Sequence, residues 1–246
     1  MATYQIFIPT WRRMGNSTTL NNLADKRSVI VAIRPEEEEY YRTRDYNVMV
    51  LPPDCIGLGA AQHYIFNNAE ADLVWLADDD LKNTNLDKDI EYISYYAGQE
   101  QAGIFGLGRH FMKHIRIEKD GIWTRTGSTG GCWGVNKKMY QASGLDSSPW
   151  TVVCDLYLWI GMQAAGYGAL ISNLCIMKGG EGKTGGCVDY RTNEMVVDAV
   201  YKLQEAFPRY FHIFPSDTAT IQRHKVGLGF RVEWKRIHED NFKSLI

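Results

Sequence analysis

Four short apolar segments, separated by segments with helix signals, recur within the first 77 residues, and this alternation restricts the fold more than any other feature. The apolar segments span residues 4–8, 29–33, 47–51 and 73–77. They are rich in β-branched and aromatic side chains, and each is a near-continuous apolar run, which is typical of strands buried on both faces. The sequence therefore predicts an α/β fold in which helices flank a mostly parallel sheet.

The segments between these strands favour helices. Ser17 or Asn16 can cap a helix over residues 18–26, and Pro35 at a first helical position, followed by four glutamates, favours another helix start. Residues 59–69 are also predicted to be helical. Beyond residue 98 the pattern becomes glycine-rich, and convincing helices return over residues 154–166 and 194–207.

Charge and cysteine content exclude several classes of protein. No run approaches the roughly 20 apolar residues of a membrane span and no signal segment is visible, so we expect a cytoplasmic protein with no membrane partner. Five cysteines without a CxxC pair predict neither a disulfide framework nor a structural zinc site. The net charge of −2 gives no overall attraction to nucleic acid, although residues 222–236 are locally basic.

Three consecutive aspartates, Asp78, Asp79 and Asp80, follow the fourth predicted strand. In parallel sheets, ligands bind beyond the carboxyl ends of the strands, where these carboxylates are expected to lie. Grouped carboxylates suit a hard divalent cation such as Mg²⁺ or Mn²⁺, which completes its shell with water and substrate phosphates. A nucleoside diphosphate is therefore a natural ligand, and a solvated turn that caps the next helix is the structural alternative.

Several segments, in their order and spacing, resemble the GT-A fold nucleotide-sugar glycosyltransferases. The resemblance covers roughly residues 4–178 and rests on IFIPTWRR, LPPDCIGLGAAQHYIFNNA, VWLADDD, GGCWGVNKKMY and VVCDLYLWIGMQAAGY. The triple aspartate and the later GGCVDYR are most similar to the small phage and TET/JBP-associated glycosyltransferases, which act on hydroxymethylated pyrimidines in DNA. This resemblance implies a single GT-A-like, Rossmann-type domain over residues 1–246. Residues 1–97 would bind the nucleotide, and residues 98–246 would bind the acceptor with a glycine-rich flap and a basic C-terminal segment.

The resemblance also implies a UDP-sugar donor and a divalent metal ion, Mn²⁺ or Mg²⁺. It assigns Asp78 to the nucleotide ribose and to the metal site, and Asp80 to the metal ion that contacts the diphosphate. Asp79 joins the nucleotide-binding residues in a middle position.

The same resemblance assigns further contacts to the donor. Thr10, Arg12 and Arg13 stand where the family holds the nucleotide base and phosphates, and arginine suits phosphate through its fork of donors. Gly130 and Gly131 belong to the glycine loop beneath the donor sugar, although a turn around a buried tryptophan is the structural alternative.

Asp155 falls at the last position of the family's xED motif, where an inverting enzyme keeps its general base. A base there must lie within hydrogen-bond reach of the acceptor hydroxyl. The alternative is a structural aspartate at a helix N-terminus, stabilised by the helix dipole.

This sequence departs from the family pattern in three places. Gln62 and His63 replace Arg-Asn, and Cys154 replaces the acidic partner of the general base. Lys178 stands where a metal-binding histidine is expected, so its ammonium would neutralise the diphosphate and metal dependence would be weaker. His224 is the alternative metal ligand or phosphate contact.

Residues 179–186 contain Gly182-Lys183-Thr184, which suggests a P-loop, but the first glycine of that motif falls at Met177. We interpret the segment as a flap in which Lys183 lies over the donor's diphosphate and excludes water.

The sequence thus predicts a glycosyltransferase that moves a hexose or pentose from a UDP-sugar to a hydroxyl, most specifically on hydroxymethylated pyrimidine in phage DNA, in the host cytoplasm. Alternatives are a polysaccharide, lipid or protein acceptor, a catalytically inactive nucleotide- or DNA-binding module, and a nucleotidyltransferase. The basic C-terminal segment, with Phe230 and Trp234 interleaved, is the candidate DNA surface. A packed terminal element whose charges face water is its alternative.

Overall fold

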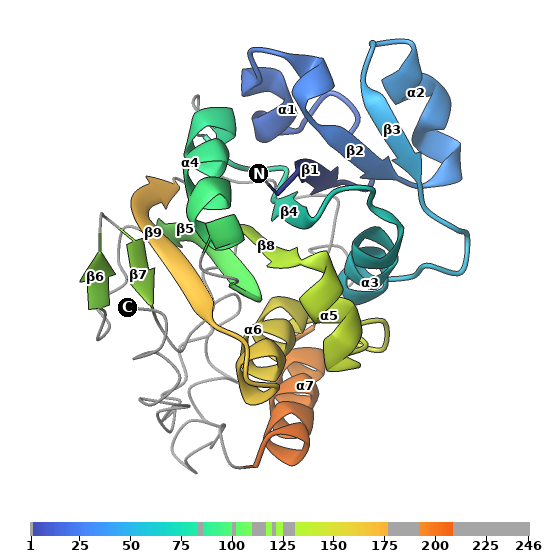
Figure 1. Ribbon diagram of the computed structural model, residues 1–246. Coiled ribbons are helices and arrows are strands. Elements are labelled where there is room, and N and C mark those ends of the chain that lie inside the picture. The colour runs from blue at the N-terminus through green and yellow to red at the C-terminus, as the bar shows by residue number, and fades with distance from the viewer. Residues whose placement is uncertain are drawn as a thin grey trace.

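The structure is a computed structural model that describes residues 2–82, 86–99, 102–109, 117–119, 122–124, 131–176 and 192–208. Within these residues one sheet contains nine strands in the order β3-β2-β1-β4-β8-β5-β9-β7-β6 (Figure 1). Their bounds are β1 Tyr4–Pro9, β2 Ile30–Ile33, β3 Asn47–Val50, β4 Leu73–Ala77, β5 Ile104–Arg109, β6 Ile117–Lys119, β7 Ile122–Thr124, β8 Cys132–Asn136 and β9 Ala169–Ile176.

The sheet is mostly parallel, as predicted. β3, β2, β1 and β4 pair in parallel, and so do β5 and β9. β8 runs antiparallel between β4 and β5, and β7 runs antiparallel to both β9 and β6. Among the described strands, all except β8 and β7 therefore run in the same direction.

Helices occupy most of the predicted places. The described α-helices are α1 Thr18–Asn22, α2 Glu38–Arg42, α3 Leu58–Asn68, α4 Leu86–Gln99, α5 Lys137–Ser143, α6 Cys154–Ala164 and α7 Asn193–Ala206. Pro35 begins a 3₁₀ turn that leads into α2, and Ser17 caps α1 through its side chain, as expected. The prediction of one helix over residues 18–26 was too long, because Asp25 accepts a hydrogen bond from the Arg27 amide and begins a separate 3₁₀ turn.

Two hydrophobic cores cover the faces of the sheet. Along β4, Leu73, Trp75 and Ala77 join the core formed with α1, α2 and α4, whereas Val74 and Leu76 join the core formed with α3, α5 and α6. β1 and β2 show the same alternation, which confirms burial on both faces for these three strands, whereas β3 at the sheet edge is only partly buried.

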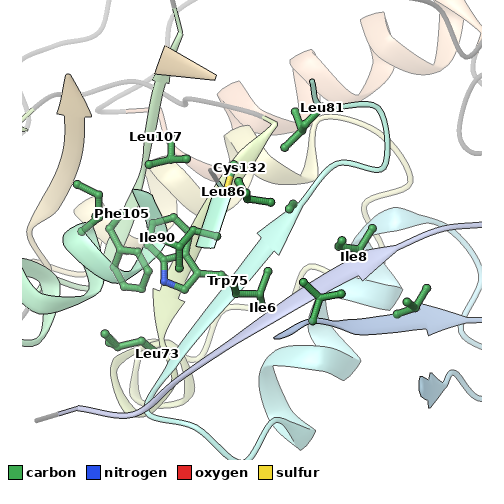
Figure 2. Packing of buried hydrophobic residues seen from close by; sticks show 14 of the residues in the cluster. Ile6, Ile8, Leu73, Trp75, Leu81, Leu86, Ile90, Phe105, Leu107 and Cys132 are labelled. Atoms are coloured by element: carbon green, nitrogen blue, oxygen red, sulfur yellow. The ribbon is translucent and has the colours of Figure 1, made fainter. Parts of the chain in front are cut away.

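In the first core, Trp75 packs against Phe105 with ring centroids 4.8 Å apart, and Ile90 of α4 lies against the same sheet face (Figure 2). The indole of Trp75 also donates a hydrogen bond of 2.8 Å to the buried Ser94 hydroxyl, which fixes α4 on the sheet. A smaller cluster joins α6 to α7. Of the helices described, none has the length and apolar character that crossing a membrane requires.

Candidate functional site

The three aspartates lie at the sheet edge where the neighbouring strands also end. Because β1, β2, β3 and β4 are parallel, Asp78–Asp80 share this edge with residues 10–13 after β1 and with Arg34 after β2. The antiparallel strand β8 begins here, and the Asp78 amide donates a 2.6 Å hydrogen bond to the Gly131 carbonyl. This edge is the position at which open α/β sheets bind ligands.

Helix α6 begins at the same edge. It packs on the sheet, and a short turn joins its end to β9. Because β9 runs in the same direction as β4, β9 begins at the amino edge of the sheet, so α6 ends at that edge and begins at the carboxyl edge. Asp155 lies in the first turn of α6 and is partly exposed. Val153, the residue directly before α6, has a φ of 51°, a left-handed conformation that is strained for a β-branched residue. The topology thus brings Asp155 to the edge that carries the aspartates.

Asp79 points into the protein. It is 9% exposed, its Oδ2 accepts a 2.9 Å hydrogen bond from the Thr10 hydroxyl, and its Oδ1 is paired with the Arg13 guanidinium. Burial raises the pKa of Asp79 to about 6, against the lowering effects of Arg13 and Thr10. The carboxylate is therefore mainly ionised at neutral pH, and both of its oxygens are engaged inside the protein.

The backbone of the aspartate turn is held by the start of α1. The Asp79 carbonyl accepts hydrogen bonds from the Ser17 hydroxyl, at 2.8 Å, and from the Thr19 amide, at 3.2 Å. The Thr19 hydroxyl donates to the Asp78 carbonyl at 2.6 Å and accepts from the Leu81 amide at 2.8 Å. Ser17 could be predicted as a helix cap, but the role of Thr19 could not, because a hydroxyl in a helix gives no sign of a partner about 60 residues away.

Asp78 and Asp80, on either side of Asp79, are partly exposed. Among the residues that the structure describes, no group of three or more His, Cys, Asp or Glu side chains is arranged to hold a metal ion. Two carboxylates nevertheless fit Mg²⁺ or Mn²⁺, since such an ion is usually bound by one or two carboxylates and takes its remaining ligands from water and phosphate.

The two adjacent arginines after β1 have different environments. Arg13 is buried against Asp79, whereas Arg12 is exposed and its guanidinium lies 4.5 Å from the ring centroid of Trp11. The Arg12 backbone has a φ of 57°, and its amide donates a 2.9 Å hydrogen bond to the buried Glu37 carboxylate. Burial raises the pKa of Glu37. The Arg12 backbone is therefore held by Glu37, while its side chain places an exposed positive charge at the edge.

Arg34 is a cation at this edge that sequence analysis did not single out. It follows β2 directly, and its guanidinium donates a 3.1 Å hydrogen bond to the Pro53 carbonyl in the segment after β3. Its position immediately after a buried strand is the sequence signal that could have identified it.

In its fold the chain is similar to TarS of S. aureus. Residues 1–349 of TarS superpose with a TM-score of 0.54 and 10% identity, over 89% of this chain and 69% of that one. The structure of the same TarS fragment in complex with UDP-GlcNAc gives 0.54 and 11%, over 89% and 70%, and the complex with UDP gives 0.53 and 12%, over 89% and 69%. The chain has a GT-A-like fold. No protein-family model matches the sequence, and no curated protein is detectably similar to it.

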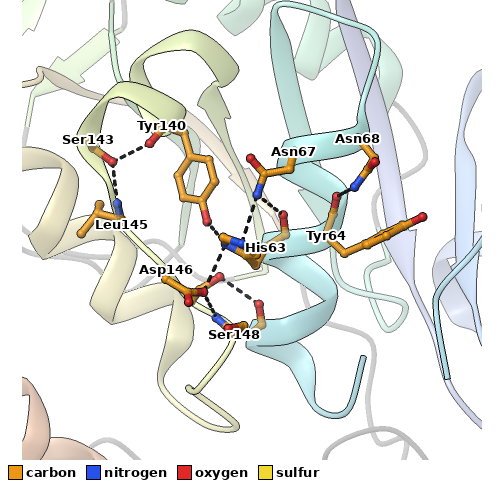
Figure 3. Close-up of polar contacts among 11 residues, drawn as sticks. His63, Tyr64, Asn67, Asn68, Tyr140, Ser143, Leu145, Asp146 and Ser148 are labelled. Atoms are coloured by element: carbon orange, nitrogen blue, oxygen red, sulfur yellow. Dashed lines mark hydrogen bonds and ion pairs between the residues drawn. The ribbon is translucent and has the colours of Figure 1, made fainter. Parts of the chain in front are cut away.

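Gln62 and His63, which stand where the resemblance expects Arg-Asn, face other protein groups. Gln62 is buried, and the Nδ1 atom of His63 lies 2.7 Å from the Tyr140 hydroxyl and 3.3 Å from an Asp146 carboxylate oxygen (Figure 3). The amide nitrogen of Asn67 lies 3.2 Å from the other ring nitrogen of His63. These contacts tie α3 to α5 and to the segment that leads into α6.

The predicted glycine loop is described in part. Gly131 is buried with a φ of 89°, a conformation that favours glycine, and Trp133, two residues later, is buried, as the structural alternative expected. Gly130, Lys178, Lys183 and His224 lie outside the described residues.

Proposed function

We propose that this protein is a glycosyltransferase that moves a sugar from a UDP-sugar to an acceptor hydroxyl. The observation that carries the proposal is the aspartate turn at the end of β4, where Asp79 is buried and Asp78 and Asp80 are partly exposed. It is supported by the fold shared with TarS, whose structure is known with UDP-GlcNAc and with UDP.

The donor would bind along the carboxyl edge of the sheet. Arg12 is an exposed cation there and would contact the diphosphate, because a guanidinium offers two parallel donors to phosphate oxygens. Asp78 would accept hydrogen bonds from the ribose hydroxyls, and Asp78 and Asp80 would hold a divalent ion. When bound, such an ion supplies positive charge to the diphosphate leaving group.

Asp155 would act as the general base of the transfer. It would accept the proton of the acceptor hydroxyl while that oxygen forms a bond to the anomeric carbon of the donor. The bond between the anomeric carbon and the diphosphate oxygen would break, and UDP would leave with the electron pair beside Arg12. The preceding residue, Cys154, is buried and carries a thiol in place of the acidic side chain that the resemblance expects. Asp155 would therefore act as the base without a second carboxylate beside it in the sequence.

We propose hydroxymethylated pyrimidine in DNA as the acceptor, on the resemblance of the segments around VWLADDD and GGCVDYR. The basic segment 222–236, with its interleaved aromatic residues, would contact the DNA backbone. Binding through phosphates weakens steeply as salt rises, whereas binding of a neutral glycan or of a protein acceptor would change little.

The test is a panel of UDP-sugars incubated with DNA that contains cytosine, hydroxymethylcytosine or hydroxymethyluracil, followed by digestion and mass spectrometry of the nucleosides. We expect a hexose or pentose mass increment on one hydroxymethylated base. Asp80→Asn should abolish the increment, and a chelator should abolish it until Mg²⁺ or Mn²⁺ is returned.

Two outcomes would contradict the proposal at different levels. If the protein hydrolyses a UDP-sugar or binds UDP but transfers sugar to none of the DNA substrates, the proposed donor stands and the proposed DNA acceptor is wrong. If calorimetry detects no binding of UDP or of any UDP-sugar, with and without Mn²⁺, the glycosyltransferase proposal itself is wrong.

A further inference from the structure

Asp79 occupies the middle of the aspartate triple, but its surroundings differ from those of a ligand-binding carboxylate. Both of its oxygens have a partner, one the Thr10 hydroxyl and one the Arg13 guanidinium, and all three residues are buried. A nucleotide or an ion that replaced either partner would break a buried hydrogen bond to a charged group. Such a break is costly, because it leaves one charge without its partner in a medium of low dielectric constant.

The contacts of Asp79 join two segments that are distant in sequence. Thr10 and Arg13 belong to the segment after β1, and the Thr10 amide is itself fixed by a 3.0 Å hydrogen bond to the Ala32 carbonyl of β2. Asp79 belongs to the segment after β4, the other neighbour of β1 in the sheet. The ion pair therefore connects the aspartate turn to the centre of the parallel sheet.

A buried ion pair contributes little net stability compared with apolar side chains of similar volume, so stability alone is a weak reason for this one. Its geometric effect is specific. It fixes the residue between Asp78 and Asp80, and thereby the directions in which those two carboxylates leave the backbone. Catalysis is sensitive to such directions, since a displacement of about 1 Å at a reacting group can cost about 100-fold in rate.

We propose that Asp79 and Arg13, with Thr10, are positioning residues that set the geometry of Asp78 and Asp80, and that Arg13 does not contact the donor. This inference rests on the proposed function, because it gives the aspartates their roles in donor binding. It divides the two arginines: Arg12 acts on the donor directly, and Arg13 acts through Asp79.

The test compares Asp79→Asn, Arg13→Met and the double variant Arg13→Met/Asp79→Asn. Each single variant leaves a buried group without its charged partner, so we expect Tm to fall by roughly 10 °C, with most of that loss recovered in the double variant. Activity should behave differently. Since either substitution breaks the same link, kcat/KM should fall by about 10- to 100-fold in both single variants and by a similar factor in the double variant.

Arg12→Met is the matched control, because it removes a neighbouring cation that is exposed. It should leave Tm unchanged and weaken UDP binding by about tenfold, and its effect on kcat/KM should multiply with that of Asp79→Asn, as expected for independent sites.

Two results would overturn the positioning role. Wild-type kcat/KM in the recovered double variant would mean that the pair only stabilises the fold. A double variant whose loss equals the product of the two single losses would mean that Arg13 and Asp79 act separately on the donor. UDP binding to the wild-type protein is measured first. If the wild-type protein does not bind UDP, the proposed function and this inference both fail. If it binds UDP and the double variant gives either of these two results, only this inference fails.

Discussion

Thr19→Val tests whether one buried hydroxyl holds the aspartate turn together. The Thr19 side chain is 1% exposed, and its hydroxyl both donates to the Asp78 carbonyl at 2.6 Å and accepts from the Leu81 amide at 2.8 Å. Valine keeps the shape of the side chain but removes both bonds. A buried polar group left unpaired costs about 1–3 kcal/mol, so leaving the Asp78 carbonyl and the Leu81 amide unpaired should lower the free energy of unfolding by roughly 2–6 kcal/mol.

Urea unfolding, followed by tryptophan fluorescence and by circular dichroism, measures this loss directly. Thr19→Ser keeps the hydroxyl and removes one methyl group, so it should cost about 1 kcal/mol, and the partly exposed Thr18→Val should change stability by less than about 0.5 kcal/mol. If Thr19→Val is as stable as Thr19→Ser, the hydroxyl does not fix the turn and the argument is wrong. In the same preparations, sugar transfer should fall in Thr19→Val and be largely retained in Thr19→Ser.

Three further predictions concern the chemistry and the packing around the site. Asp155→Asn should lower kcat by about 100-fold or more and change UDP affinity by less than about threefold, because a general base acts on the acceptor proton. Equal losses of kcat and of UDP affinity would place Asp155 in donor binding. Gly59→Ala should cost roughly 3 kcal/mol of unfolding free energy, since its Cβ would lie 2.1 and 2.2 Å from two backbone carbonyl oxygens. Its control, Gly98→Ala on α4, has one side-chain carbon at 3.1 Å and should be neutral or stabilising by up to about 1 kcal/mol. Similar stabilities of the two variants in urea would refute the close approach at Gly59. Burial raises the pKa of the Cys132 thiol well above its usual value, so a variant with Cys132 as its one cysteine should react with Ellman's reagent at pH 8 only after unfolding, and rapid native-state reaction would contradict this burial.

The first four strands could be predicted from the sequence because each is a mostly apolar run, fully buried in β4, largely buried in β1 and β2 and half-buried in β3 at the sheet edge. Residues on both faces of β1 and β4 enter hydrophobic cores, so their segments contain almost no polar side chains and stand out as apolar runs. The strands β5, β8 and β9 were less evident. β8 contains Gly134, whose absent Cβ would lie 2.5 Å from the Val74 carbonyl and from the Phe105 ring. Glycine lowers the strand propensity of this segment, but the contact with β4 requires it, and that contact is not visible in local sequence.

The position of the aspartate turn could also be predicted, because it depends only on where a strand ends. The different environments of Asp78, Asp79 and Asp80 could not. Three identical side chains give no local sign of which one is buried, and that choice is made by Thr10 and Arg13, which precede the turn by more than 60 residues. The same holds for Arg12 and Arg13, which are adjacent and chemically identical, and of which one is exposed and the other buried.

This division changes the charge that the site offers to a donor. If both arginines faced the diphosphate, their two positive charges would match the two negative charges of a nucleotide-sugar diphosphate. With Arg13 paired to Asp79 inside the protein, that pair contributes no net charge. The charges left at this edge are those of Arg12 and Arg34 and of the carboxylates of Asp78, Asp80 and Asp155. Three negative charges and two positive charges leave a net charge of −1, which would oppose the binding of a diphosphate, so productive binding would need further positive charge. A divalent ion on Asp78 and Asp80 would reverse the sign of the site, whereas the ammonium of Lys178 alone would only bring these charges to zero. The geometry of the Arg13–Asp79 pair therefore favours a metal-dependent enzyme, and full activity in the presence of chelator would show that Lys178 or another cation supplies the missing charge.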